Sequence, residues 1–118
     1  MKPLPLPKLK ERAEILATEV QNFINVSALL GQRITSSSAD RTLLKKLKEE
    51  LDQLQADRKH EVSELRKFLY DVAVLIDAPA QKVDAVVVMN QRFDQLRLAQ
   101  NPLLRRHEAL RVKVAQLR

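Results

Sequence analysis

The sequence contains no cysteine and a single glycine among its 118 residues. Without cysteine, disulfides and thiolate metal sites are excluded, and a cytoplasmic location is the expected one. One glycine is too few for a glycine-rich loop that cradles phosphate groups. It also leaves few of the tight turns on which β-hairpins depend. These two shortages argue against a sheet fold and against a phosphate-binding loop.

Aromatic residues make up only 3% of the chain, and tryptophan is missing. The core must therefore be aliphatic, and the aromatic platforms on which RNA-binding modules stack bases are not expected. The apolar run Ala85–Met89 is five residues long, whereas a membrane-spanning helix needs about 20. Three prolines within residues 1–7 disfavour the helical core of a secretory signal. A membrane span is therefore not predicted.

The residue patterns that usually carry catalysis are also missing. His60 and His107 are far apart, and neither has a second histidine at the spacing of a helical metal site. The Glu-x-x-His pattern of di-iron bundles does not occur. No serine lies in a nucleophile-elbow motif. We therefore expect no enzymatic activity, no metal, no cofactor and no small-molecule ligand.

The chain is rich in residues that favour helices. Charged residues make up 31%, and alanine, leucine, glutamine and arginine are common. Apolar residues recur at alternating spacings of three and four, which predicts heptad seams. The predicted fold is all-α: an elongated antiparallel helical hairpin or bundle with coiled-coil-like seams and about four helices. The predicted seam residues are Leu9, Leu16, Val20, Phe23, Leu30, Leu44, Leu47, Leu51, Leu54, Leu65, Leu69, Val72 and Ile76.

Prolines, the glycine and a serine run set the expected boundaries. Helices are predicted over residues 7–30, 39–76, 79–100 and 102–118, grouped as an extended leader at 1–7, a bundle core at 8–100 and a basic arm at 101–118. Gly31 is expected to end the first helix in the left-handed conformation. Ser37 or Ser38 is expected to cap the second helix. The leader is expected to pack Leu4 and Leu6 on the bundle, the alternative being a strap that docks in a partner's groove.

The second helix contains the main irregularity. Its 3-4 rhythm reaches Arg58, and the next apolar residue is Val62, which is a phase slip in the seam. Residues 56–61, polar apart from Ala56, predict a solvent-bridging stretch, with the helix continuous rather than broken. Residues 68–76 are apolar around most of the circumference and are predicted to form the centre of the core. The first seam also contains one polar residue, Ser27.

The last two helices differ in character. The apolar face of the third is predicted to consist of Val83, Val86, Val87, Phe93 and Leu96, and a strand at 85–89 is rejected for want of a partner strand. Asn101-Pro102 predicts the start of the fourth, whose seam is Leu103, His107, Leu110, Val114 and Leu117. His107 is expected at the edge of this seam, with its ring half exposed to water.

The net charge of +6 is concentrated near the end of the chain. Residues 78–118 hold eight basic and three acidic residues. A contact with a partner or with a polyanion is expected at Arg92, Arg97, Arg105, Arg106, Arg111, Lys113 and Arg118. Acidic residues of the second helix are the internal alternative for docking the arm, namely Glu49, Glu50, Asp52 and Asp57.

Two functions follow from these features. The regular seams favour a helical assembly or adaptor protein that associates with an acidic protein partner or with itself as an oligomer. The basic C-terminal region supports the alternative, a DNA-binding or other nucleic-acid-binding accessory protein with salt-dependent phosphate contacts. Binding to a membrane surface ranks last, because residues 102–118 lack tryptophan and phenylalanine.

Overall fold

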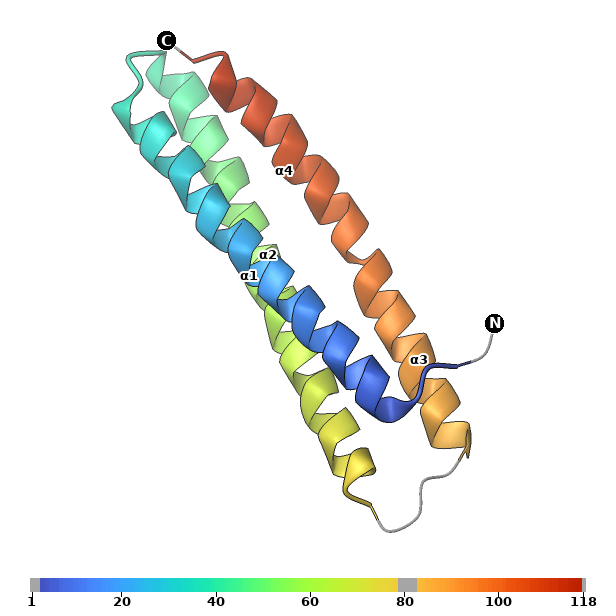
Figure 1. Ribbon diagram of the computed structural model, residues 1–118. Helices are drawn as coiled ribbons and strands as arrows, with labels where there is room; N and C mark the ends of the chain where they lie inside the picture. Colours follow the sequence, from blue (N-terminus) through green and yellow to red (C-terminus); the bar gives the residue numbers. More distant parts are fainter. Residues whose placement is uncertain (1–2, 79–82, 118) are drawn as a thin grey trace.

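The computed structural model describes residues 3–78 and 83–117, and within them the regular structure is entirely α-helical. The helices are α1 (Leu6–Ser36), α2 (Arg41–Ile76), α3 (Val83–Leu98) and α4 (Gln100–Ala115). α1 and α2 form an antiparallel hairpin, and α3 and α4 follow one another as a third rod beside it (Figure 1). The described part measures 61 × 24 × 17 Å. The prediction of an elongated all-α bundle is confirmed.

Helix α1 is longer than predicted. It continues through Gly31 to Ser36, and Gly31 does not adopt a positive φ. A Cβ atom built on Gly31 would lie 3.3 Å from Cδ2 of Leu51 on α2. The prediction that Gly31 ends the helix is therefore wrong. The glycine instead leaves room for the Leu51 side chain to pack against the backbone of α1.

The connection between α1 and α2 is correspondingly short. Asp40 caps α2, and its carboxylate accepts a hydrogen bond of 3.4 Å from the backbone N–H of Thr42. The Ser37 hydroxyl accepts from the N–H of Ala39 at 3.2 Å, within the connection. The predicted serine cap is wrong, and of the residues 31–38 left between the first two predicted helices only 37 and 38 are non-helical. Asp40 caps the helix in place of Ser37 or Ser38, because an aspartate side chain can accept the same hydrogen bond from a free backbone N–H.

Helix α2 runs without a break through the polar stretch at 56–61, as predicted. Arg58 is 0% exposed in the seam, so the expectation of a solvated stretch is wrong for this residue. Near the end of α2, Phe68 and Val72 are fully buried, whereas Tyr70 is 71% exposed. The end of α2 exposes only Tyr70 and Val74 and packs at one end of the bundle, so the prediction that it forms the centre of the core is wrong.

Helices α3 and α4 form nearly one rod. Only Ala99 separates them, and its N–H still donates to the carbonyl of Gln95 at 2.9 Å. Pro102 has no N–H to offer the carbonyl of Leu98, so the interruption falls upstream of the proline. The predicted cap at Asn101 is wrong, because Asn101 lies inside α4.

The predicted features of α3 had mixed outcomes. Residues 85–89 are helical, as predicted. Val83 is 78% exposed and does not belong to the apolar face that was expected to include it, whereas Phe93 is buried. The predicted start of this helix, at residue 79, lies outside the described residues.

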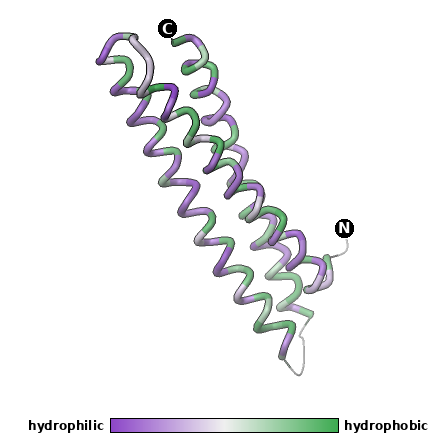
Figure 2. Tube along the Cα trace, turned by 60° about the vertical axis from the view of Figure 1, so that its left-hand side comes forward, coloured by the Kyte–Doolittle hydropathy of each residue, from purple (hydrophilic) through white to green (hydrophobic). Residues whose placement is uncertain are grey.

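The core consists of three clusters along the bundle. One end is built around Phe68 and Phe93, the middle around Val20 and Leu65, and the other end around Leu54, with residues of α4. Hydrophobic and hydrophilic positions alternate along every helix, as expected of amphipathic helices (Figure 2). Every predicted seam residue is buried or half-buried.

The leader packs on the bundle, as predicted. Leu6 is 1% exposed, and Leu4 packs against the cluster around Phe68. Asn90 of α3 fixes this segment, because its Oδ1 accepts from the N–H of Leu4 at 2.8 Å and its Nδ2 donates to the carbonyl of Leu4 at 3.0 Å. Nowhere in residues 3–78 and 83–117 is there a helix long and apolar enough to cross a membrane.

Candidate functional site

A layer of polar side chains interrupts the apolar core in the middle of the bundle. α1 contributes Ser27, α2 contributes Arg58, and α4 contributes Gln100 and His107, each at most 6% exposed. Polar groups taken out of water raise the free energy of the folded state unless hydrogen bonds replace the lost hydration. The hydrogen bonds within this layer therefore decide which of its members are satisfied.

Ser27 and His107 satisfy one another. The Ser27 hydroxyl and Nδ1 of His107 share a hydrogen bond of 3.0 Å, and the edge of the Phe23 ring contacts the imidazole with centroids 5.7 Å apart. Burial lowers the pKa of His107, and the nearby positive charge of Arg58 lowers it further. His107 is 6% exposed, so the prediction of a half-wet ring is wrong. The serine opposite it allows the ring to be buried.

Arg58 is only partly satisfied. Its Nη2 donates to the carbonyl of Leu103 at 3.4 Å, and its guanidinium carbon lies 4.7 Å from the centroid of the Phe23 ring. Nε and Nη1 are buried without a hydrogen-bond partner, and no ion pair forms between Arg58 and any carboxylate of the described residues. Burial lowers the pKa of Arg58, and the charge of Arg106 adds to this. A buried charge without a counter-ion is costly.

A pocket of about 170 Å³ lies beside Arg58, between α1 and the third rod. Its apolar walls include Leu16, Val20, Phe23 and Leu104, and its polar lining is Glu19, Arg58, Arg97, Gln100 and Asn101. Gln100 donates from Nε2 to Glu61 at 3.3 Å and to the carbonyl of Leu96 at 3.0 Å. Its Oε1 is buried without a partner. The pocket therefore combines an unpaired cation with an unpaired amide oxygen.

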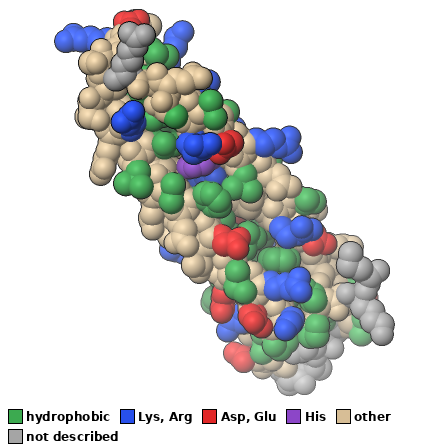
Figure 3. Space-filling model, turned by 45° about the horizontal axis from the view of Figure 1, so that its top comes forward, with side chains coloured by type: hydrophobic (Ala, Val, Ile, Leu, Met, Phe, Trp, Pro, Cys, Tyr) green, Lys and Arg blue, Asp and Glu red, His purple; other side chains and the backbone are tan. Residues whose placement is uncertain are grey.

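The two helices that flank this pocket, α1 and α4, carry exposed apolar side chains, of which Leu104 lines the pocket. We call them the groove face: Ile15, Val26 and Leu29 on α1, and Leu104 and Val112 on α4, which are 37–60% exposed. α1 packs chiefly on α2 and less extensively on α4. Figure 3 looks onto this side of the molecule and shows hydrophobic side chains close together across its middle, with charged side chains around them.

Three of the predicted basic contact residues pair with carboxylates of α2. Arg106 donates to Asp57 at 2.7 Å, and Lys113 lies 3.3 Å from Glu50. The hydrogen bond from Arg106 is the main cause of the lowered pKa of Asp57. The internal acidic partners considered from the sequence thus include two that α4 contacts.

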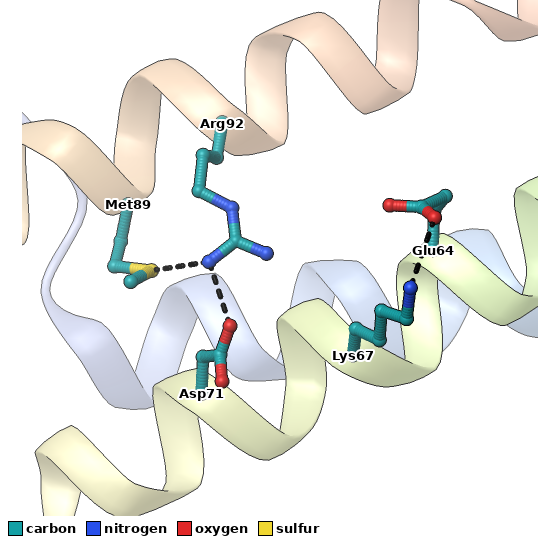
Figure 4. A network of polar contacts seen from close by, with 5 residues as sticks. All are labelled: Glu64, Lys67, Asp71, Met89 and Arg92. Carbon is teal, nitrogen blue, oxygen red and sulfur yellow. Dashed lines mark hydrogen bonds and ion pairs between the residues drawn. The ribbon is translucent and has the colours of Figure 1, made fainter.

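Arg92 makes the corresponding contact between α3 and α2. It donates to Asp71 at 2.8 Å and lies over the ring of Phe68, with its guanidinium carbon 5.4 Å from the centroid. Figure 4 shows Arg92 reaching from α3 toward Asp71, with Met89 beside it. Lys67 and Glu64 pair along α2 in the same view.

The remaining predicted basic residues of the described chain form no ion pair with α2. Arg97 pairs with Asp94 and Arg111 pairs with Glu108, in both cases along one helix. Arg105 is exposed and forms no ion pair within residues 3–78 and 83–117. Arg118 lies outside the described residues. The division of the chain into a core and a separate basic arm stays a prediction, although the apolar side of α4 packs in the bundle.

Sequence reasoning missed the pocket and the role of Gln100. A signal for the polar layer was present, because Ser27, Arg58 and His107 all occupy seam positions on three different helices. Such polar residues at seam positions often fix the register of helices. The spacing pattern did not reveal that the three lie at one level of the bundle, because that depends on how the helices are aligned.

Across the described residues, no three histidine, aspartate or glutamate side chains are grouped so that they could hold a metal ion. Comparison with known protein families, with curated proteins and with solved structures finds no match. Function is therefore inferred from the polar layer, the pocket and the groove face.

Proposed function

We propose that this protein is a non-enzymatic assembly or adaptor protein that binds a helix of a partner protein along the groove face. The observation that carries the proposal is the set of large apolar side chains that α1 and α4 leave 37–60% exposed beside a pocket. Clustered exposed apolar side chains are typical of interaction sites. An amphipathic helix that lays its apolar stripe into such a surface is a common mode of recognition.

The charges around the groove face favour an acidic partner. Arg97, Arg105 and Arg111 are exposed on the third rod, and Arg33 is exposed on α1. The acidic groups beside them are Glu19, Asp94 and Glu108, of which Asp94 pairs with Arg97 and Glu108 with Arg111, so the basic excess rests on Arg33 and Arg105. The preferred partner is therefore a helix with an apolar stripe and acidic borders, because complementary charges speed encounter and disfavour wrong partners.

The other occupants fit less well. A second copy of this chain would bring a basic border against a basic border, and like charges across an interface oppose association. A nucleic acid would compete for basic groups that are already in use, since Arg92, Arg106 and Lys113 each contact a carboxylate of α2. No specific contact favours phosphate over these carboxylates.

The test uses a designed helical peptide of about three heptads, with a leucine stripe and glutamate borders. Added to the isotope-labelled full chain, it should shift backbone amide resonances of α1 and α4 around Leu29 and Leu104. The same peptide with lysine borders should bind at least tenfold more weakly. Leu29→Glu should abolish binding, whereas Val74→Glu, which changes a residue 52% exposed on α2, is the matched control.

Analytical ultracentrifugation decides between the occupants. The full chain alone should sediment as a monomer at micromolar concentrations. A dimer that Leu29→Glu dissociates would make a second copy the occupant and contradict the proposal. Duplex DNA binding that is lost with rising salt and leaves the peptide without effect would support the nucleic-acid alternative instead.

A further inference from the structure

We infer that the pocket beside Arg58 takes the carboxylate of a glutamate side chain from the partner helix, and that Arg58 pairs with it. The inference rests on the proposed function, because it names the group by which the partner helix is recognised. Four observations support it: the unpaired buried charge, the composition of the pocket, its size, and its access to the surface.

The charge of Arg58 has no compensation within the described residues. Its side chain is 0% exposed, and the carbonyl of Leu103 satisfies only Nη2. Burial lowers the pKa of Arg58, and the positive charge of Arg106 lowers it further. Water would satisfy the N–H groups of Arg58 but would leave the charge unbalanced. An anion satisfies both, and a carboxylate matches the planar guanidinium.

The walls of the pocket suit a side chain that is apolar along its stem and anionic at its tip. Phe23 and Leu104 would cover the methylene groups. The Asn101 amide, which lines the pocket, offers a further donor. The buried Oε1 of Gln100 is an acceptor and repels a carboxylate oxygen. The carboxylate therefore belongs on the Arg58 side of the pocket.

The size and position of the pocket agree with a glutamate side chain. Its volume is about 170 Å³, and a cavity of about 150 Å³ is enough to hold benzene. Benzene has one non-hydrogen atom more than a glutamate side chain. The lining runs from the exposed Glu19, Asn101 and Leu104 down to the fully buried Arg58. Arg58 is closed to water in the free chain, so a side chain that enters from the groove face meets the guanidinium once the side chains above it move aside.

The experiment is a double-mutant cycle between the protein and the peptide. In the acidic peptide described above, each glutamate is replaced by glutamine in turn, and binding to the full chain is measured by calorimetry. One replacement should weaken binding at least tenfold. With Arg58→Met, the same replacement should change binding less than twofold. Arg58→Met should still fold, since a buried ion replaced by an apolar residue of similar volume is often tolerated.

The outcomes separate the two proposals. If the peptide binds and no single glutamine replacement matters, the groove proposal stands and the carboxylate inference is wrong. If no peptide binds, the groove proposal itself is wrong. Should Arg58→Met be unfolded by circular dichroism, Arg58→Lys supplies the cycle, because lysine keeps the charge but loses the planar fork and should reduce the glutamate preference.

Two further controls address other sources of a carboxylate. Sodium acetate, compared with sodium chloride at equal ionic strength, should not raise the melting temperature at millimolar concentration. A rise that Arg58→Met removes would make a free small carboxylate the ligand and overturn the partner assignment. Glu19→Gln should leave stability unchanged. A large loss would make Glu19 the natural counter-ion of Arg58 and overturn the inference.

Discussion

The two sides of α1 are built differently. Toward α2, the packing is close and aliphatic: Gly31 leaves room for the Leu51 side chain, and Val20, Val62 and Leu65 form a buried cluster. Toward α4, the contact depends on the hydrogen bond between Ser27 and His107 and leaves a pocket beside Arg58. From this difference we expect the α1–α2 hairpin to supply most of the stability, while the α1–α4 side holds the groove face and the pocket on which the proposed recognition depends.

The largest effect is expected on the aliphatic side. Leu65→Ala removes a side chain that is 0% exposed between α1 and α2 and should lower the free energy of unfolding by about 2–5 kcal/mol. Urea denaturation followed by circular dichroism measures this loss. Leu43→Ala, at a residue 44% exposed on α2, is the control and should have little effect. Equal losses of unfolding free energy in the two variants would contradict the expectation that the buried packing between α1 and α2 supplies most of the stability.

The close approach at Gly31 predicts the next effect. Gly31→Val places branched carbons where even a Cβ would be 3.3 Å from Leu51. Such overpacking should destabilise the fold by about 1–3 kcal/mol, beyond the gain in helix propensity over glycine. The neighbouring exposed residue gives the matched control, Gln32→Val. If both variants melted at the same temperature, the close packing of α1 on α2 would not matter for stability.

On the α4 side, stability should depend on pH through His107. Its pKa is lowered in the folded protein, so the unfolded chain binds the proton more tightly. Stability is therefore complete above the unfolded pKa of about 6.5, and it falls as the pH drops from there to the folded pKa. Arg58 on α2 and Arg111 on α4 oppose the imidazolium, and Glu108 favours it.

Urea denaturation measures the free energy of unfolding between pH 8 and pH 5, a range that includes the reference histidine pKa of about 6.5. His107→Gln should remove most of this pH dependence, while His60→Gln, at an exposed position on α2, should leave it in place. An unchanged pH dependence in His107→Gln would assign the effect to other groups.

The smallest effect is expected for the ion pairs that join α4 to α2. Arg106→Met breaks the contact with Asp57 and should cost about 0.2–1 kcal/mol, because both side chains are well exposed to water. Arg105→Met is the control, since Arg105 has no ion pair within the described chain. Differential scanning calorimetry at low and high salt should show the difference shrinking as salt rises.

Sequence periodicity predicted the helices because burial along a helix repeats every three or four residues. The continuity of α2 was predicted for another reason, because residues 56–61 contain neither proline nor glycine although the periodicity slips there. The sequence pattern misplaced the end of α1, because the need for glycine at position 31 comes from Leu51 on another helix. It placed the α3–α4 interruption too late, because a proline affects the carbonyl four residues before it. Both errors concern effects that act at a distance along or between helices.

The candidate site was harder to predict than the fold. The basic residues and two of their acidic partners, Glu50 and Asp57, were recognisable from charge alone. The burial of Arg58 and His107 was not, because isolated charged residues usually indicate a solvated face. Their environment depends on three helices meeting at one level, and spacing along one helix carries no information about that alignment.

The two hydrogen bonds between Asn90 and the backbone of Leu4 limit how far the third rod can slide along α1. A leucine seam repeats every heptad, so one helix that slides by seven residues, about 10.5 Å, finds an equivalent set of apolar contacts. Asn90 grips both the N–H and the carbonyl of Leu4, and Ser27 bonds His107 further along the bundle. A slide by one heptad would bring Gln100 or Val114 to the level of Ser27 in place of His107, and Val83 or Arg97 to the level of Leu4 in place of Asn90. Together they oppose sliding of the third rod along α1, so the exposed side chains of the two elements keep one alignment along the bundle axis.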